Sequence, residues 1–240
     1  MSPTTFDLDA LNAKLRGAPP ETILEAALDL EPTGLRLACS LGLEDMALLH
    51  MIRAAGLPID AFVLFNGPLN PETYTLLAEA QSRYAPVAVY FPQAEAVEAF
   101  VNAEGIDAFR RSLDLRKACC ALRKVEPLGR ALKGARGWIT GLRRDQNPTR
   151  RDLGAFELDW SQGGLLKVNP LLAWSLEETW AYVNAHDVPV NPLHAQGFPS
   201  LGCAPCTRAV APGEDPRAGR WWWERPEHKE CGLHPAKATR

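Results

Sequence analysis

The chain has 240 residues, of which 46% are hydrophobic and 23% charged, and its formal net charge is -3. A chain of this size and composition can bury a full core, and it fits one large soluble domain better than two small ones. The charge excludes a globally basic surface, so we expect no nucleic-acid partner, and any anion site must be a local cluster of cations.

The apolar stretches and the cysteine content predict a cytoplasmic protein with no membrane partner. No stretch approaches the roughly 18 consecutive apolar residues of a membrane span, and the first 15 residues lack the basic-then-apolar order of a secretory signal. Six cysteines are too few for a disulfide-stapled scaffold, and a reducing compartment keeps most of them as thiols. Metal or redox chemistry is then the alternative to simple burial of these cysteines.

The first 90 residues predict strands that alternate with helices. Apolar residues between positions 8 and 29 recur at helical spacing and are interrupted by Gly17, Pro19 and Pro20, which indicates two short helices. The predicted strands that follow span 35–39, 59–65 and 87–90, and the predicted helices between them span 44–55 and 71–84. This alternation is typical of βαβ units in a parallel sheet.

The second half of the chain continues this pattern and then loses it. Helical spacing occurs near 94–103 and 120–133, a short strand is predicted at 138–140, and a helix is predicted at 176–185 behind the cap-like Ser175. We therefore predict a doubly wound, mainly parallel, Rossmann-like α/β body over 1–190. Residues 191–240 form a loop-rich segment of the same domain.

Four cysteines could supply thiolates to one centre, because Cys119 and Cys120 are adjacent and Cys203 and Cys206 form a second pair. Four thiolates hold iron–sulfur clusters, whereas structural zinc usually takes its sulfurs from two spaced pairs. Adjacent residues diverge by about 100° on a helix, so both reach one centre only where the backbone is distorted. A multi-atom cluster tolerates this better than a single ion. The spacing favours an iron–sulfur cluster, while zinc and a structural or disulfide role stay open.

Cys231 differs from these four, since no second cysteine lies near it in the sequence. Its neighbours His228, Lys229 and His234 favour the thiolate, which is the reactive form of cysteine. Gly232 argues against burial in a regular element. We interpret Cys231 as an accessible nucleophile, and an inert cysteine near the terminus is the alternative. The sixth cysteine, Cys39, lies in an apolar strand and is interpreted as a small buried residue.

Two kinds of anion contact are predicted. The turn at 40–45 follows a strand and precedes a helix, so Ser40, Gly42 and the backbone N–H groups there could hold a phosphate. A purely structural turn is the alternative, because one glycine is not a phosphate loop. Arginine forks match phosphate and sulfate oxygens. The basic clusters, each of which could also be a solvated face, contain Lys124, then Arg143, Arg144 and Arg150, then Arg217 and Arg220.

Five motifs in this order resemble the assimilatory adenylyl-sulfate reductases of bacteria and plants, over about residues 20–235. They are CCALRKVEPL, ITGLRRDQNPTR, GCAPCTRAV, GRWWWE and KECGLH. The resemblance implies an adenine nucleotide alpha-hydrolase-like fold and a [4Fe-4S] cluster on Cys119, Cys120, Cys203 and Cys206. The sister group, which uses 3′-phosphoadenylyl sulfate, commonly lacks these cysteines, so their presence favours the unphosphorylated nucleotide.

The resemblance also implies a mechanism. The Cys231 thiolate attacks the sulfur of adenylyl sulfate, AMP leaves, and the S-sulfocysteine is cleaved by thioredoxin or glutaredoxin to release sulfite. Cations must neutralise the phosphosulfate before a thiolate approaches it. The residues implied in this role are Lys124, Arg143, Arg144, Arg150, Arg217, Arg220 and His234. The sequence leaves open whether the chain forms a homo-oligomer.

The segment after the second predicted strand departs from the family pattern. Family members usually carry Leu-Asp-Thr-Gly-Arg-Leu, whereas this chain has Phe65 and Pro68 at the positions of the acid and the arginine. Two rival functions follow from these observations. One is a phosphoadenylyl-sulfate reductase on the same scaffold, and the other is a zinc-binding structural or sensing protein in which Cys231 has no catalytic role.

Overall fold

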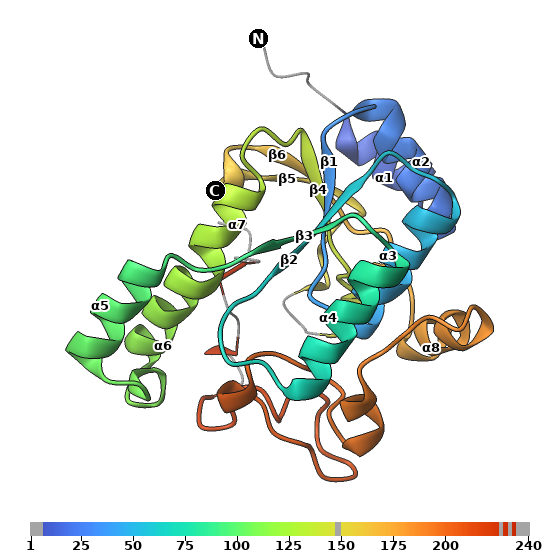
Figure 1. The fold of residues 1–240 in the computed structure, drawn as a ribbon. Coiled ribbons are helices and arrows are strands. Elements are labelled where there is room, and N and C mark those ends of the chain that lie inside the picture. The colour runs from blue at the N-terminus through green and yellow to red at the C-terminus, as the bar shows by residue number, and fades with distance from the viewer. Residues whose placement is uncertain (1–6, 147–149, 226–227, 230–231, 234–240) are drawn as a thin grey trace.

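A central six-stranded sheet carries the fold of the computed structural model, which describes residues 7–146, 150–225, 228–229 and 232–233 (Figure 1). The strands are β1 (Leu35–Ala38), β2 (Asp60–Leu64), β3 (Val87–Tyr90), β4 (Gly137–Ile139), β5 (Phe156–Asp159) and β6 (Leu165–Val168). Their order in the sheet is β3-β2-β1-β4-β6-β5. All neighbours pair in parallel except β5, which runs antiparallel to β6 at one edge. The predicted mainly parallel α/β fold is confirmed.

Helices cover both faces of the sheet (Figure 1). They are α1 (Leu8–Lys14), α2 (Pro20–Leu30), α3 (Leu43–Ala54), α4 (Pro71–Arg83), α5 (Ala94–Glu104), α6 (Leu113–Cys120), α7 (Glu126–Ala131) and α8 (Leu176–Ala185). Apolar side chains of α2, α3, α4 and α8 join one core cluster with Leu37 and Ile139 of the central strands. The opposite face of the same strands presents Phe62 and Trp138 to α7. Because side chains alternate along a strand, neighbouring residues supply the two cores.

Helix and strand boundaries agree closely with those predicted from the sequence where a capping residue defines the end of an element. Helix α8 begins behind Ser175, whose side chain accepts from the N–H of Glu178 while the Glu178 carboxylate accepts from the N–H of Ser175. This reciprocal capping satisfies N–H groups that a helix start leaves without partners. The helix predicted near 120–133 is longer in the structure. It begins at Leu113 and passes through a π-helical turn, Ala121–Val125, before α7.

The β5–β6 hairpin was not predicted from the sequence. Both strands carry buried charged residues, Glu157 on β5 and Lys167 on β6, which face each other across the ladder. These charges interrupt the apolar pattern by which strands are identified. Gly163 and Gly164, both with positive φ, lie in the connection and are the local signal for a hairpin.

Residues 187–225 run along one end of the body, beside the carboxyl ends of the parallel strands (Figure 1). Their regular structure consists of two short 3-10 turns, Pro192–Gln196 and Ala204–Cys206, and a bridge between Thr207 and Arg220. The predicted loop-rich character is thus seen, while the division at residue 190 within one domain stays a prediction. Among the described residues, no helix is both long and apolar enough to cross a membrane.

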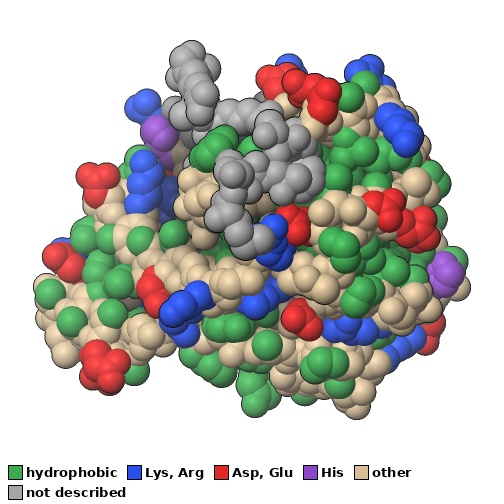
Figure 2. Space-filling view, turned by 90° about the horizontal axis from the view of Figure 1, so that it is seen from above, with side chains coloured by type: hydrophobic (Ala, Val, Ile, Leu, Met, Phe, Trp, Pro, Cys, Tyr) green, Lys and Arg blue, Asp and Glu red, His purple; other side chains and the backbone are tan. Residues whose placement is uncertain are grey.

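Charges of both signs are scattered over the face that Figure 2 shows, with hydrophobic side chains between them. This arrangement agrees with the small net charge of -3. It means that this face presents no extended field of one sign, so an anionic ligand has to be recognised by a local arrangement of cations.

Candidate active site

The cavity lies where the strand order of the sheet reverses. Strand β1 leads to β2 on one side, whereas the next strand added on the other side of β1 is β4. Ligands of open α/β sheets bind outside the carboxyl ends of the strands at such a switch point. A cavity of about 340 Å³ occupies this place, lined by residues that follow β1, β2 and β4 and by the C-terminal segment. Its size lies at the lower end of small-molecule sites.

The turn between β1 and α3, which contains Ser40 and Gly42, forms one wall of the cavity, and phosphate binding by these two residues stays a prediction. Leu41 has φ 62°, a left-handed conformation that is uncommon for a residue with a branched side chain, and its side chain is buried. Gly42 is the N-cap residue of α3, and no side chain among the described residues caps this helix start. The N-terminus of α3 therefore presents backbone N–H groups beside the cavity.

Asp45 holds this turn in place. Its Oδ2 accepts hydrogen bonds from the backbone N–H of Ser40 (2.7 Å) and from the Ser40 hydroxyl. Its Oδ1 accepts from the N–H of Gly141, after β4, at 2.9 Å. Burial raises the pKa of Asp45 to about 6, and the hydrogen bonds from Ser40 and Gly141 oppose this rise. Because the single hydroxyl proton of Ser40 points to Asp45, Ser40 is committed to the turn and does not donate that proton into the cavity.

Five of the predicted cations line the cavity: Lys124, Arg143, Arg150, Arg217 and Arg220. All except Arg217 are buried. They come from the π-helical turn, the loop after β4 and the C-terminal segment, so the fold gathers charges that are far apart in the sequence. Arg144 is exposed and does not line the cavity. Cys231 and His234 lie outside the described residues.

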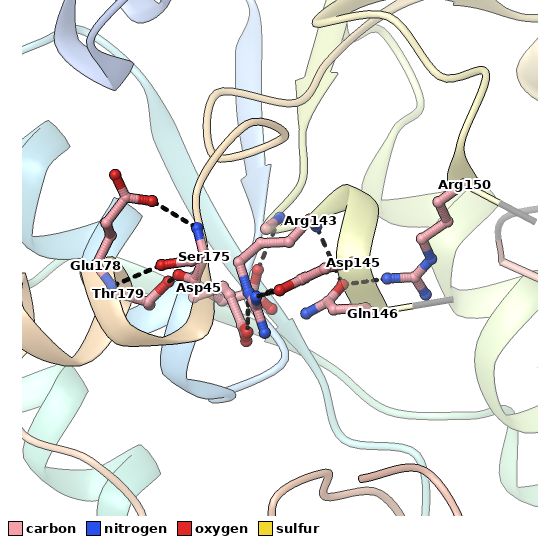
Figure 3. Close-up of polar contacts among 10 residues, drawn as sticks. Asp45, Arg143, Asp145, Gln146, Arg150, Ser175, Glu178 and Thr179 are labelled. Atoms are coloured by element: carbon pink, nitrogen blue, oxygen red, sulfur yellow. Dashed lines mark hydrogen bonds and ion pairs between the residues drawn. The ribbon is translucent and has the colours of Figure 1, made fainter. Parts of the chain in front are cut away.

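Arg143 lies in the loop after β4. It is held by one carboxylate from α3 and by one from its own loop (Figure 3). Its Nε donates to Glu44 Oε1 at 2.8 Å, and its Nη1 donates to both oxygens of Asp145 at 2.5 and 2.6 Å. Arg150 donates to Gln146 Oε1, whose amide oxygen also accepts from the backbone N–H of Arg143. Side chains of the loop and of α3 thus hold two guanidinium groups in place.

Trp221 lines the cavity and lies beside three cations. Trp221 is 1% exposed, and the centroid of its ring lies 4.7 Å from Arg116 Cζ, 4.8 Å from Arg220 Cζ and 5.9 Å from Lys124 Nζ. Trp221 is thus a buried packing residue. Its ring also supports two of the cavity cations by cation–π contact.

The two cysteine pairs come together although more than 80 residues separate them. Cys119, Cys120, Cys203 and Cys206 form one apolar cluster with Phe109 and Trp221. The Cys203 thiol donates to Asn66 Oδ1 at 3.1 Å, and the N–H of Ala204 donates to the Pro68 carbonyl at 2.8 Å. The segment that departs from the family pattern therefore binds the cysteine-bearing part of the chain.

The predicted iron–sulfur cluster is nevertheless wrong, and with it the assignment of Cys119, Cys120, Cys203 and Cys206 as metal ligands of a [4Fe-4S] cofactor. Among the described residues, no group of three or more histidine, cysteine, aspartate or glutamate side chains is arranged to hold a metal ion. The void between the cysteines is about 20 Å³, which suits about one water-sized group. Burial raises the pKa of Cys119 and that of Cys206, the latter to about 12, so both favour the thiol over the metal-binding thiolate.

Several cavity residues were missed by sequence reasoning. Asp45, Thr73, Asn191 and His194 all line the cavity. Asn191 donates to the Thr73 hydroxyl at 2.7 Å, and His194 Nδ1 lies 2.8 Å from the Phe198 carbonyl, so this nitrogen carries a proton. Their local signals are weak, because a lone polar residue in a loop is more often structural. The predicted buried role of Cys39 agrees with its 2% exposure, and burial raises the pKa of its thiol.

Comparison with known proteins identifies the family. The model of the phosphoadenosine phosphosulfate reductase domain matches residues 34–209. The chain belongs to this family. It is 50% identical over 205 residues to the adenosine 5′-phosphosulfate reductase of Burkholderia cepacia, covering 85% of this chain and 82% of that protein. It is 52% identical over 198 residues to the protein of the same name from Allochromatium vinosum, covering 82% and 77%.

Solved structures agree with this assignment to the phosphoadenosine phosphosulfate reductase family. The phosphoadenylyl-sulfate reductase of Candida auris, solved as a phosphate complex, superposes with a TM-score of 0.73 at 29% identity and covers 88% of this chain and 99% of that chain. An FMN adenylyltransferase of Candida glabrata reaches a TM-score of 0.56 at 14% identity, covering 86% and 68%, which shows a shared fold alone. The predicted family and an oxidoreductase that acts on sulfur are confirmed.

Proposed function

We propose that the chain reduces adenylyl sulfate to sulfite and AMP in the cavity at the switch point. The observation that carries this proposal is the gathering of Lys124, Arg143, Arg150, Arg217 and Arg220 around one nucleotide-sized cavity. Close relatives of the chain bear the name of this activity. A cavity with this number of cations suits a ligand with several anionic oxygens.

The cations and the N-terminus of α3 have complementary tasks in this proposal. Backbone N–H groups at a helix start bind phosphate oxygens well, and α3 begins beside the cavity. Arg143 and Arg150, fixed by Glu44 and Gln146, neutralise the phosphosulfate. Neutralisation is needed because an anionic nucleophile must approach an anionic substrate.

Cys231 is the proposed nucleophile. Its thiolate forms a bond to the sulfur of the sulfate group, the bond from that sulfur to the bridging oxygen breaks, and AMP leaves with the electron pair. Described residues on both sides of Cys231 contact the site and support the proposal. The Lys229 carbonyl accepts from Arg217 at 2.9 Å, and Leu233 lines the cavity.

Thioredoxin is the proposed reductant, with glutaredoxin as the alternative dithiol protein. One thiolate of the dithiol attacks the sulfur of Cys231 and expels sulfite, and the second thiolate then releases Cys231 as the dithiol becomes a disulfide. Two electrons pass from the dithiol to the sulfate sulfur, so the step balances without a further redox group.

Mass spectrometry of the full chain incubated with adenylyl sulfate and no reductant tests the proposal. We expect a mass increase of one sulfonate group on the peptide that contains Cys231, which disappears on addition of reduced thioredoxin. The Cys231→Ser protein is the control and should carry no adduct. An adduct on another cysteine, or sulfite formation by the Cys231→Ser protein, would contradict the mechanism.

The identity of the nucleotide has a separate test. Turnover of adenylyl sulfate and of its 3′-phosphorylated analogue should be compared at equal concentrations. We expect a higher kcat/KM for the unphosphorylated nucleotide. An equal or higher value for the phosphorylated one would assign the chain to the sister activity.

A further inference from the structure

We propose that Asp45 is a positioning residue, which couples the anion-binding turn after β1 to the arginine-bearing loop after β4. The inference rests on the proposed function, because it takes adenylyl sulfate as the ligand. Asp45 joins two segments that are 96 residues apart in the sequence and that form adjacent walls of the cavity. It acts through Ser40 and Gly141.

The geometry shows why this carboxylate cannot be replaced by a similar group without loss. Its two oxygens accept three hydrogen bonds, two from Ser40 and one from Gly141. Asp45 is 7% exposed, so water cannot easily replace these donors. An asparagine at this position has one acceptor oxygen, and its amide N–H groups would face a backbone N–H of either Ser40 or Gly141.

Close packing at Gly141 makes the coupling stiff. A Cβ atom at this position would lie 2.3 Å from Asp45 Oδ1 and 2.8 Å from Glu44 Cβ. The loop backbone therefore lies directly against the first turn of α3. Glu44, the residue before Asp45, holds Arg143 of the same loop at 2.8 Å. Two adjacent carboxylates thus set the distance between the start of α3 and the Arg143 guanidinium group.

If charge alone mattered, removal of the Asp45 carboxylate would strengthen anion binding, which is the opposite of what a positioning role predicts. Asp45 and Asp145 both line the cavity, and each adds one negative charge to a site that binds an anion. Removal of either charge should tighten anion binding if charge is the only factor. A positioning role predicts that Asp45→Asn weakens binding. Asp145→Asn should tighten it, because the remaining amide oxygen can still accept from Arg143 and water can reach a side chain that is 53% exposed. The matched pair therefore separates the two explanations.

Calorimetric binding of adenylyl sulfate to the Cys231→Ser protein, which cannot form the adduct, is the test. We expect Asp45→Asn to weaken binding about tenfold, the equivalent of one to two lost hydrogen bonds. Asp145→Asn should bind more tightly than the parent. Binding by Asp45→Asn that equals or exceeds that of the parent overturns the inference. If the parent itself binds no adenylyl sulfate, the proposed function fails instead.

A double-mutant cycle shows whether Asp45 acts through Ser40. Ser40→Ala should weaken binding a fewfold alone and add no further loss to Asp45→Asn, because the two residues share one hydrogen bond. Additive losses would contradict the coupling. Ser40 is exposed, so its substitution leaves the core intact.

The pH dependence of adenylyl sulfate binding can be measured without a mutation at Asp45. It therefore tests the inference even if the Asp45→Asn protein does not fold. Affinity for adenylyl sulfate should fall as the pH drops through about 6, where Asp45 gains a proton, and Asp45→Asn should remove this dependence. The other groups that face Asp45 are Glu44, the Cys39 thiol and, beyond Glu44, His194. Protonation of His194 would favour an anion, which is the opposite sign. Unchanged or rising affinity on acidification overturns the inference.

Discussion

Gly141 illustrates how one absent methyl group shapes the site. Its backbone approaches Asp45 and Glu44 so closely that no side chain fits between them. Sequence reasoning placed Gly141 in a basic motif and gave it no role. The contact partner lies 96 residues earlier, and a single sequence contains no signal for such a pair.

Gly141→Ala should therefore lower the free energy of unfolding by about 1–3 kcal/mol, because the added carbon meets backbone and carboxylate atoms that cannot move apart. Urea unfolding measures this change. Gly129→Ala is the matched control, since Gly129 lies within α7 and an added Cβ there meets no atom within 4 Å. This control should gain about 0.5–1 kcal/mol from the higher helix propensity of alanine. Equal effects at the two positions would contradict the close contact.

For single residues, the sequence predicted which types of side chain the site contains, but it did not predict which side chains contact one another. Lys124, Arg143, Arg150, Arg217 and Arg220 were identified from their chemistry, and all line the cavity. Arg144, adjacent to Arg143, is exposed and does not line the cavity. Sequence alone does not tell which of two neighbouring arginines faces inward, because the loop after β4 has no regular period.

Helix α6 and the C-terminal segment are joined by a buried ion pair. Arg116, in the middle of α6, donates to both carboxylate oxygens of Glu224 at 2.9 Å and to the His228 carbonyl at 2.6 Å. The Arg116 side chain is 1% exposed and that of Glu224 is 7% exposed. The pair thus anchors the chain shortly before Cys231.

Glu224→Gln should destabilise the protein by about 3 kcal/mol, because it leaves the Arg116 charge buried without its counter-charge. Urea unfolding gives the free energy of unfolding, and turnover of adenylyl sulfate should fall at the same time. The control is Glu214→Gln at the exposed Arg208–Glu214 pair in the same segment, which should have little effect on either. A loss at Glu214 as large as that at Glu224 would show that burial is not the cause.

Elements with a strong local period were predictable to within one or two residues, as α4, β3 and α8 show. The β5–β6 hairpin was missed because its buried Glu157 and Lys167 resemble a polar loop in sequence. The four cysteines were correctly expected to meet, yet the cofactor inferred from their spacing was wrong. The spacing of cysteines in the sequence can indicate that their thiols lie close together in the fold. It does not reveal the size of the void between the thiols, nor that burial favours the protonated form of the thiol.

The cavity is a property of the whole molecule, because its walls come from segments between residues 38 and 233. A ligand that touches all of these segments binds the folded chain and not the unfolded one. The fold class was predictable from alternation along the sequence. The sequence pointed to one wall of the cavity, the turn at 40–45, whereas no local pattern reveals the strand order that brings the other walls beside it.

AMP should therefore stabilise the entire fold. At about 100 times its Kd, the gain in the free energy of unfolding should be about 2.7 kcal/mol, measured by urea unfolding with and without the nucleotide. Adenosine, which has no phosphate for the cations to hold, is the control and should stabilise far less at the same concentration. Equal stabilisation by both ligands would show that the cations do not contact the phosphate.

The position of Trp221 beside the cavity cations should affect the fluorescence of the protein. Fluorescence from an indole depends on the electric field across its ring, and two of the three cations beside this ring, Lys124 and Arg220, also line the cavity. An anion that draws either cation toward itself changes that field. Arrival of a nucleotide should thus be visible as a shift in emission without any added dye, even though the ring itself is sealed from solvent.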